Sequence, residues 1–590
     1  MHHLRDLTVL ILGLGDSGLA MARWCARCGA TVHVADTRAN PPQAATLAEQ
    51  VTTATLHHGL NPALLDGVRL VLKSPGLVPH APEVAPLLSR ADELAIPVRG
   101  ELSLFASALA DLKAEMGYAP KVVAITGTNG KTTTTSLTAK LMERAALRVG
   151  LAGNIGPSLL DTLRQALEQE PTRLPVDEAP AVPSLLADAD ADPDDRPQQA
   201  EPSDGDTEAS DDKLPDDADH ADAPLVQLAP PPPAAPTFEV LPDAWVLELS
   251  SFQLDGVHHF EPDAAVVLNI TQDHLDWHGT MAAYAEAKSR IYGQRATMVV
   301  NRDEPMVEAM VPPPEVIKSG VRGRPARTVH RRVVRFGLDA PRAPGDFGLV
   351  VESGMAWLVR ALEADPTLKR AKVAKGAQAE DDEIILQRLM PADALRIRGR
   401  HNASNALAAL ALATAVGCPL APMLHGLREY RGEPHRVEHV MTLRGVDAID
   451  DSKGTNVGAT VAALLGLGAD LSPGKLSLIL GGDGKGQDFA PLREPVGRFA
   501  RAVALIGRDA DAIGEVLAGV QMPSGDDIAL HRFDSLEAAT RWAHGQANAG
   551  DAVLLSPACA SLDMFRNYAH RAEVFVQTLQ ALAADLGDIA

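Results

Sequence analysis

The sequence predicts an α/β protein with mainly parallel sheets, organised in three blocks. Short apolar runs alternate with helical patterns, and glycine-rich turns follow several of the apolar runs. At 590 residues, the chain is also too long for one hydrophobic core. The predicted domains comprise residues 1–105, 116–431 and 432–590.

The first block opens with a predicted strand, Leu7–Leu12, followed by Gly13-Leu-Gly-Asp-Ser-Gly18. A second predicted strand, Thr31–Ala35, leads into Asp36. This spacing fits the dinucleotide-binding fingerprint, in which a phosphate lies at a helix N-terminus. The pattern alone indicates a phosphate-bearing nucleotide and does not identify it as NAD.

Cys25 and Cys28 follow this turn in a predicted helix. Their spacing is that of half a zinc site, but the sequence has only two further cysteines, Cys418 and Cys559, far apart. We therefore expect helix packing rather than a metal site.

The second block opens with strand Lys121–Thr126, and Thr126-Gly-Thr-Asn-Gly-Lys-Thr132 leads into a threonine-rich helix. A strand, a glycine loop and a helix N-terminus form an anion cradle, because free N–H groups and the helix dipole face the phosphates. Lys131 is placed to reach the β- and γ-phosphates and Thr132 to bind Mg²⁺. Ile125 replaces the first glycine of the usual motif, so the loop is a variant. The alternative is a tight turn with a surface lysine.

Two further polar clusters follow predicted strands. Glu248 comes directly after Ala244–Leu247, and Asp273, His274, Asp276 and His278 follow Ala264–Leu268. Carboxylates at strand ends suit Mg²⁺, although a capping residue and a polar turn are the alternatives. Considered alone, Lys288 is expected on the surface. With the glycine loop, these groups suit phosphoryl transfer, where positioning and charge neutralisation provide most of the catalysis.

Charge and hydropathy restrict the partners. The net charge of −23 argues against nucleic acid. Residues 171–236 hold 17 acidic residues, 3 basic residues and 14 prolines, which predicts a disordered insertion. No apolar run is long enough for a membrane helix and no signal peptide is recognisable, so we expect a cytoplasmic protein without membrane insertion.

The third block alternates strands and helices again. Its predicted strands are Asp447–Asp450, Leu476–Leu480, Ala502–Ile506 and Ala552–Ser556.

In order, TGTNGKT (126–132), ELSSFQL (248–254), DHLDWHG (273–279) and GRHNASN (399–405) resemble the motif set of the Mur ligase family. In the third block, DDSKGTN (450–456), GGDGKGQDF (481–489) and LSPACASLDMF (555–565) are most similar to the members that add D-glutamate to UDP-N-acetylmuramoyl-L-alanine. A member that adds a different amino acid is the alternative.

The resemblance implies an N-terminal Rossmann-like domain, a central P-loop ATPase domain and a C-terminal Rossmann-like domain. It implies that ATP phosphorylates the alanyl carboxylate and that the amine of D-glutamate attacks the acyl phosphate, in cytoplasmic peptidoglycan precursor synthesis. It further implies two Mg²⁺ ions and a lysine carbamylated by CO₂. We expect a monomer.

The resemblance also implies a role for each matching residue. Lys131, Glu248, His274 and Lys288 would be catalytic, and Thr132, Glu248, His274 and carbamylated Lys288 would hold the metal ions. ATP would contact Gly127, Thr128, Asn129, Gly130, Lys131, Thr132, Thr133, Asn402, Asn405, His435, Arg436 and Asp451. The UDP-linked substrate would contact Ser17, Asp36, Thr37, Arg38, Gly76 and Asn154. D-Glutamate would contact Lys453, Thr455, Lys485, Ser561 and Tyr568.

Two other classes of function remain as rivals. An NAD-dependent oxidoreductase would explain the first glycine motif but not residues 126–132. A non-catalytic ATP-binding module would not need the intact set of Lys131, Glu248, His274 and Lys288.

Overall fold

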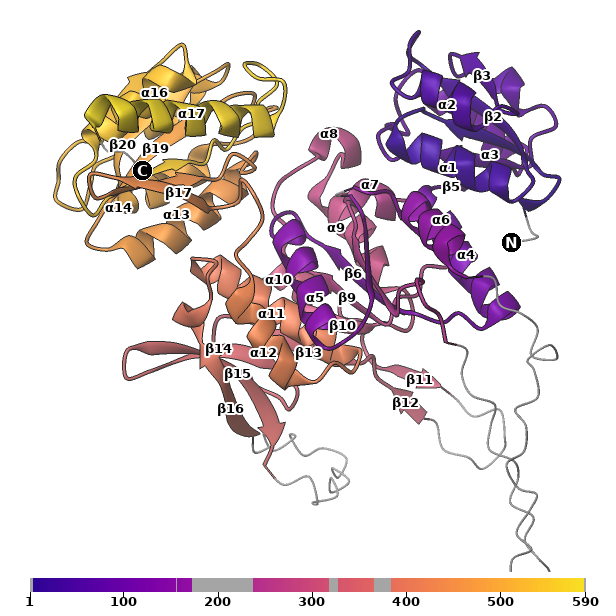
Figure 1. Ribbon diagram of the computed structural model, residues 1–590, viewed down its shortest axis with the longest axis horizontal. Coiled ribbons are helices and arrows are strands. Elements are labelled where there is room, and N and C mark those ends of the chain that lie inside the picture. Colours follow the sequence, from indigo (N-terminus) through magenta and orange to yellow (C-terminus); the bar gives the residue numbers. More distant parts are fainter. Residues whose placement is uncertain (1–3, 155, 172–236, 318–326, 365–383, 588–590) are drawn as a thin grey trace, which may run out of the picture. The chain divides into compact units, whose positions relative to one another are not determined.

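The computed structural model describes residues 4–154, 156–171, 237–317, 327–364 and 384–587. Apart from residue 171, the predicted insertion at 171–236 lies outside the described residues. The fold is α/β with mainly parallel sheets, as predicted (Figure 1).

The N-terminal part is a five-stranded parallel sheet in the order β3-β2-β1-β4-β5. Its strands are β1 (Thr8–Leu12), β2 (Thr31–Asp36), β3 (Thr55–His58), β4 (Leu70–Lys73) and β5 (Val98–Arg99). Its helices are α1 (Asp16–Arg27), α2 (Ala44–Gln50) and α3 (Ala85–Glu93), and α4 (Glu101–Met116) follows β5. The strands predicted at 7–12 and 31–35 are confirmed, and Cys25 is buried in α1 as expected. The helix α4 continues past residue 105, where the first domain was predicted to end. That domain boundary stays a prediction.

Both faces of this sheet are covered, as parallel sheets require. Val9 and Ile11 of β1 pack into one apolar cluster, whereas Leu10 and Leu12 pack into another. Successive side chains of a strand point to opposite faces, so an uninterrupted apolar run marks a strand buried on both sides.

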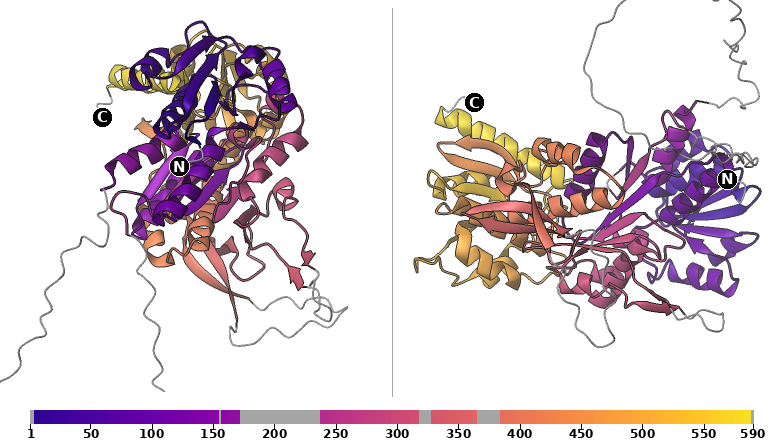
Figure 2. Two further views of the ribbon diagram at one scale, coloured as in Figure 1. Left: turned by 90° about the vertical axis from the view of Figure 1, so that its right-hand side faces the viewer. Right: turned by 90° about the horizontal axis from the view of Figure 1, so that it is seen from below.

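The central part is a six-stranded parallel sheet in the order β13-β10-β9-β6-β8-β7, and its strands lie side by side in the turned views (Figure 2). Its strands are β6 (Lys121–Thr126), β7 (Val149–Gly153), β8 (Ala244–Glu248), β9 (Ala264–Val267), β10 (Thr297–Asn301) and β13 (Val333–Phe336). The helices in this part are α5 (Lys131–Arg144), α6 (Leu159–Gln169), α7 (Ser251–Leu254), α8 (Leu275–His278), α9 (Met281–Ser289), α10 (Pro305–Glu308), α11 (Arg400–Ala415) and α12 (Leu420–Glu429).

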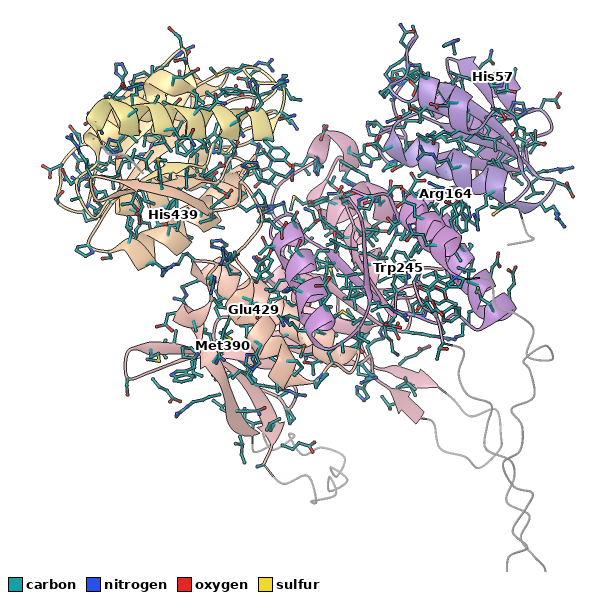
Figure 3. The ribbon with its side chains drawn as sticks, in the orientation of Figure 1. His57, Arg164, Trp245, Met390, Glu429 and His439 are labelled. Carbon is teal, nitrogen blue, oxygen red and sulfur yellow. The ribbon has the colours of Figure 1, made fainter. Side chains whose placement is uncertain are left out.

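Trp245 of β8, labelled in Figure 3, is fully buried in this part. Its indole donates to the Tyr118 hydroxyl at 2.9 Å and its ring meets Phe105 edge-on. A Cβ on Gly150 of the neighbouring strand would lie 2.7 Å from the indole, so this position accommodates only glycine without a shift.

Two antiparallel sheets flank the central sheet, and the sequence did not predict either. One pairs β11 (Glu315–Ile317) with β12 (Arg327–Val329). The other pairs β14 (Phe347–Glu352), β15 (Met355–Glu363) and β16 (Ile384–Pro391).

The C-terminal part is a six-stranded sheet in the order β17-β18-β22-β19-β20-β21, in which only β17 runs antiparallel to its neighbour. Its strands are β17 (Glu438–Leu443), β18 (Val446–Asp450), β19 (Leu476–Gly481), β20 (Ala500–Ile506), β21 (Ala529–Arg532) and β22 (Ala552–Leu555). Its helices are α13 (Val457–Leu471), α14 (Arg493–Phe499), α15 (Ala510–Leu517), α16 (Leu536–Gln546) and α17 (Tyr568–Leu586). Figure 1 shows α16 and α17 on one side of this sheet and α13 and α14 on the other, and the four predicted strands are confirmed.

Glu170 fastens the two chain ends that border residues 171–237. Its carboxylate accepts hydrogen bonds from the backbone N–H groups of Glu239, Val240 and Leu241 at 2.7–2.8 Å. The chain therefore leaves the central part and re-enters it at one point.

None of the helices among the described residues combines the length and the apolar character that a membrane span requires.

Candidate active site at the carboxyl edge of the central sheet

The glycine loop joins the end of β6 to the start of α5. Lys131, the first residue of α5, donates from Nζ to the carbonyl oxygens of Gly127 (2.9 Å) and Thr128 (2.8 Å). Burial lowers the pKa of Lys131, and the nearby Glu248 carboxylate opposes that shift. A cation at a helix N-terminus beside free N–H groups is a phosphate-binding arrangement.

Gly130 lies where the loop meets α11. Its φ is +79°, and a Cβ there would lie 2.6 Å from Oδ1 of Asn405. Asn405 in turn donates to Oδ1 of Asn402 at 3.1 Å. Glycine is therefore required here, and two predicted ATP-binding asparagines on α11 lie beside the loop.

Glu248 ends β8, which pairs with β6, and its side chain is only 1% exposed. Oε1 accepts a hydrogen bond from Nδ2 of Asn154 at 2.9 Å, whereas Oε2 is buried without a hydrogen-bond partner among the described residues. An unpaired carboxylate oxygen in such a place is costly, so this donor fits a hard cation such as Mg²⁺.

Lys288 is 1% exposed, so the expectation of a surface lysine is wrong. Its Nζ donates to the Gly127 carbonyl oxygen at 2.8 Å and to Oγ1 of Thr126 at 3.2 Å, and it lies 4.7 Å from the centre of the Tyr284 ring. Burial, reinforced by the Lys131 charge, holds the pKa of Lys288 well below its usual value. The alanine-rich α9 places this lysine beneath the glycine loop, which local sequence does not reveal.

His274 caps α8 with a left-handed backbone, at φ +54°. Its Nε2 lies 3.5 Å from Oδ2 of Asp273, and burial lowers its pKa. Strained backbone of this kind occurs often at functional sites.

A cavity of about 400 Å³ brings many predicted residues together. The predicted site residues that line it are Thr128, Asn129, Gly130, Lys131, Thr132, Asn154, Glu248, His274, Arg436, Lys453, Thr455 and Lys485. A basic phosphate cradle, an acidic group and two further lysines therefore border one space. Such a space suits transfer of a phosphoryl group to a carboxylate and recognition of an anionic substrate.

Comparison with known proteins identifies the family of the chain. Three family models match: "Mur ligase MurD-like, N-terminal domain" at residues 7–97, "Mur ligase middle domain" at 125–192 and 238–336, and "Mur ligase, glutamate ligase domain" at 435–559. A protein from Albidiferax ferrireducens, named UDP-N-acetylmuramoylalanine--D-glutamate ligase, is 52% identical over 100% of this chain and 98% of its own length. The chain belongs to the Mur ligase family.

Another Mur ligase with the same name, from Burkholderia mallei, is 51% identical over 98% of both chains. Among solved structures, the UDP-N-acetylmuramate-alanine ligase MurC from Thermotoga maritima is 16% identical with a TM-score of 0.48, covering 98% of this chain and 100% of its own. A likeness at this level supports no statement about substrate.

A second cavity of this Mur ligase, of about 460 Å³, adjoins the glycine loop and contains residues to which the sequence analysis gave no role. These include Asn269, Asn301, Glu304, Leu338, His401 and Ser404. Asn269 fixes the loop, because its Oδ1 accepts from the Asn129 N–H at 2.8 Å. Asn269 and Asn301 lie at or just beyond the ends of neighbouring parallel strands, and that position was the one signal that could have identified them.

Other predicted ATP residues border a smaller cavity of about 80 Å³, namely Thr133, Asn402, Asn405, Arg436 and Asp451. Burial raises the pKa of Asp451 to about 7. Gly127, Lys288, His435, Ser561 and Tyr568 do not line any of these three cavities. His435 instead pairs through Nδ1 with Oδ2 of Asp450 at 2.7 Å.

In the Mur ligase C-terminal part, Lys453 lies over the ring of Tyr568, with Nζ 3.6 Å from the ring centre. This cation–π contact fixes the ammonium group near Thr455 and the cavity. The Tyr568 carbonyl oxygen accepts a hydrogen bond from the Ser452 hydroxyl at 2.8 Å, which ties the start of α17 to the same loop.

We expect Tyr568→Leu to raise the KM for the amino acid substrate about 3- to 30-fold, because a cation–π contact contributes about 0.5–2 kcal/mol. Tyr568→Phe keeps the ring and should stay within about twofold of the wild type. ADP release at varied amino acid concentration measures both values. An unchanged KM in Tyr568→Leu would remove the ring from this role.

Arg571 joins two of the loops predicted to bind the amino acid. The side chain is fully buried, and its guanidinium donates to Oγ (3.0 Å) and O (2.8 Å) of Ser452 and to O of Cys559 (3.2 Å). The loops that carry Lys453 and Ser561 therefore share one anchor on α17. The sequence analysis missed this residue.

The residues predicted to bind UDP lie in the N-terminal part. Asp36 accepts from the Leu14 N–H at 2.6 Å and from the Arg38 side chain at 2.8–2.9 Å, and that pairing with Arg38 lowers the pKa of Asp36 to about 2. Ser17, Asp36, Thr37, Arg38 and Gly76 follow β1, β2 and β4, so they share the carboxyl edge of the sheet. Their contact with UDP stays a prediction.

Proposed function

We propose that this chain joins D-glutamate to UDP-N-acetylmuramoyl-L-alanine while ATP is split to ADP and phosphate. One observation carries the proposal: the cavity of about 400 Å³ borders Lys131, Glu248, Lys453 and Lys485 at once. A phosphate donor and two anionic substrates can therefore meet there. The shared name of relatives that are 51–52% identical over nearly the whole chain supports the choice of D-glutamate.

The proposed reaction is the one that the family resemblance implies, and the groups around the cavity suit it. An oxygen of the alanyl carboxylate attacks the γ-phosphorus of ATP, the bond to the bridging oxygen breaks, and ADP leaves. Lys131 is the cation that stabilises the negative charge of the phosphoryl group during its transfer. The amine of D-glutamate, having lost its proton, then attacks the acyl carbon. The attacking nitrogen then gives up a second proton to the departing phosphate or to solvent, the bond from carbon to the phosphate oxygen breaks, and an amide bond remains.

Selection of D-glutamate rests on its two carboxylates. Lys453, Thr455 and Lys485 border the cavity, Ser561 lies on a loop anchored by Arg571, and Tyr568 is the first residue of α17. A misplaced carboxylate of the L-isomer would leave buried donors unpaired, at about 1–3 kcal/mol each.

Two magnesium ions complete the proposed site. The unpaired Oε2 of Glu248 and the Thr132 hydroxyl, which accepts a hydrogen bond from Arg436, would hold one ion at the cavity. The family pattern assigns a second ion to His274, which lines the cavity, and to Lys288, which lies beneath the glycine loop. Bound Mg²⁺ would neutralise phosphate charge.

Lys288 is proposed to act as a carbamate, because a neutral amine can bond to CO₂ with loss of a proton. Its buried position favours the neutral amine. The carbamate would supply an anion where an ammonium group would repel the metal.

The proposed setting is peptidoglycan precursor synthesis in the cytoplasm, with the enzyme as a monomer. Cell wall formation, cell shape and division would depend on it.

The deciding experiment measures ADP release with UDP-N-acetylmuramoyl-L-alanine, Mg²⁺ and each enantiomer of glutamate. We expect release with D-glutamate and a rate at least about 100-fold lower with L-glutamate, because two unpaired donors cost several kcal/mol. Omission of the acceptor or of Mg²⁺ should abolish release. Release with another amino acid but not with D-glutamate would assign the chain to a different specificity within the family.

A further inference from the structure

Glu101, the first residue of α4, is a buried carboxyl group that the proposed reaction does not use. It is 3% exposed and lines a cavity of about 180 Å³ outside the active site. Burial raises the pKa of Glu101 to about 7. The group can therefore exist with or without a proton near neutral pH.

Two elements hold this carboxyl group. Its Oε1 accepts a hydrogen bond from the N–H of Leu160, in the first turn of α6, at 3.1 Å. The Ser17 side chain, at the start of α1, lies on the other side of the group, where hydrogen bonding to it lowers the pKa of Glu101 and so opposes part of the effect of burial. The carboxyl group thus links the N-termini of two helices.

Each of these helices begins at a place that the proposed reaction uses. Ser17 belongs to the glycine turn expected to hold the diphosphate. α6 follows the loop of Asn154, whose N–H and Nδ2 donate to O (2.8 Å) and Oε1 (2.9 Å) of Glu248. Glu101 therefore connects the predicted diphosphate loop with the loop that fixes Glu248.

The proton on Glu101 decides which way the Ser17 hydroxyl points. An ionised carboxylate only accepts, so Ser17 must donate its single proton to Glu101 and present lone pairs to its other side. A protonated carboxyl group can instead donate to Oγ of Ser17. The serine proton is then free for a phosphate oxygen.

Several charged groups lie around Glu101. On α6, Asp161 raises the pKa of Glu101 and pairs with Arg23 of α1 at 2.6 Å and with Arg164 at 3.3 Å. The other titratable groups around the same cavity are Lys73, Arg99, Asp255 and His258.

We propose that Glu101 is a positioning residue for the nucleotide-linked substrate: carrying one proton, it turns the Ser17 hydroxyl toward the diphosphate and ties that loop to α6. This inference rests on the proposed function. It couples the binding of the nucleotide substrate to the uptake of one proton by Glu101. The diphosphate diester of the substrate does not itself titrate near neutral pH.

The test follows the KM for UDP-N-acetylmuramoyl-L-alanine from about pH 6 to 8.5. In the wild type the affinity should be highest below about pH 7 and fall by up to about tenfold per pH unit above it, as the proton is lost. Glu101→Gln imitates the protonated acid, because its amide donates to Ser17 while its oxygen accepts from Leu160. It should keep the low KM and lose the pH dependence.

Glu101→Ala should give a KM for this substrate that does not change with pH and lies about tenfold above the wild-type value at pH 6, since it removes both hydrogen bonds and the titrating group, while the KM for ATP stays unchanged. Glu93→Gln, at an exposed carboxylate on α3 paired with Arg90, is the matched control and should behave as the wild type. Equal losses in Glu101→Gln and Glu101→Ala would overturn the proposal.

Calorimetry of the wild type in two buffers of different ionisation enthalpy provides a measurement that needs no variant. Uptake of close to one proton per substrate bound near pH 8 is expected if Glu101 is protonated on binding. Absence of uptake would overturn the inference. A wild type that binds the nucleotide with proton uptake but releases no ADP with any amino acid would instead overturn the proposed function.

Discussion

Lys131→Ala is expected to lower kcat about 10²- to 10³-fold, with the fold intact. The Lys131 ammonium group lies on the glycine loop, within hydrogen-bonding distance of two carbonyl oxygens, at the N-terminus of α5. Lys131 is placed to stabilise the charge that is redistributed over the equatorial and leaving-group oxygens in the transition state, so the loss should appear in kcat more than in the KM for ATP. Single-turnover ADP formation measures it.

Lys140→Ala provides a matched control on the same helix, because Lys140 does not line the described cavities. It should retain turnover within about twofold of the wild type, as expected for a lysine outside the site. Wild-type turnover in Lys131→Ala would show that the glycine loop does not hold the reacting phosphate.

Lys288→Ala is expected to lose at least about 100-fold in kcat and to regain part of it in the presence of acetate or formate. The substitution removes the proposed carbamate and leaves a buried space beneath the glycine loop, where a small carboxylate can stand in for it. Addition of ¹³C-bicarbonate to the wild type should give a carbamate carbon resonance that the variant lacks.

The same acids should not rescue Lys131→Ala, since a carboxylate cannot replace a phosphate-binding cation. Lys121→Ala, at the exposed start of β6, should need no rescue. Full activity of Lys288→Ala without added acid would exclude Lys288 from the metal site.

Much of the fold was predictable because buried parallel strands leave continuous apolar runs. The run at 121–126 and the glycine loop after it together specify a strand, a turn and a helix N-terminus. The antiparallel strands β14–β16 were missed, because strands with one partly exposed face give weaker patterns.

The site was predictable only where neighbouring residues form a motif. Local pattern placed Lys288 wrongly on the surface, since nothing in an alanine-rich helix marks which face meets the glycine loop. The role in the site that the resemblance implies for Lys288 stays a prediction. Arg571 is 119 residues from Ser452, so their contact exists only once the C-terminal sheet has formed. Asn301 is one polar residue at a strand end, and only the order of the strands brings it beside Asn269.

The Glu170 clasp has a consequence for how this chain tolerates change in length. The Glu170 carboxylate holds the backbone at 239–241, so the two ends of the intervening segment are fixed next to each other. The free-energy cost of closing a loop grows only with the logarithm of its length, by about 0.6 kcal/mol for each doubling. Shortening this stretch to a brief glycine–serine bridge, or splicing a fluorescent domain into it, should therefore leave the catalytic machinery nearly undisturbed.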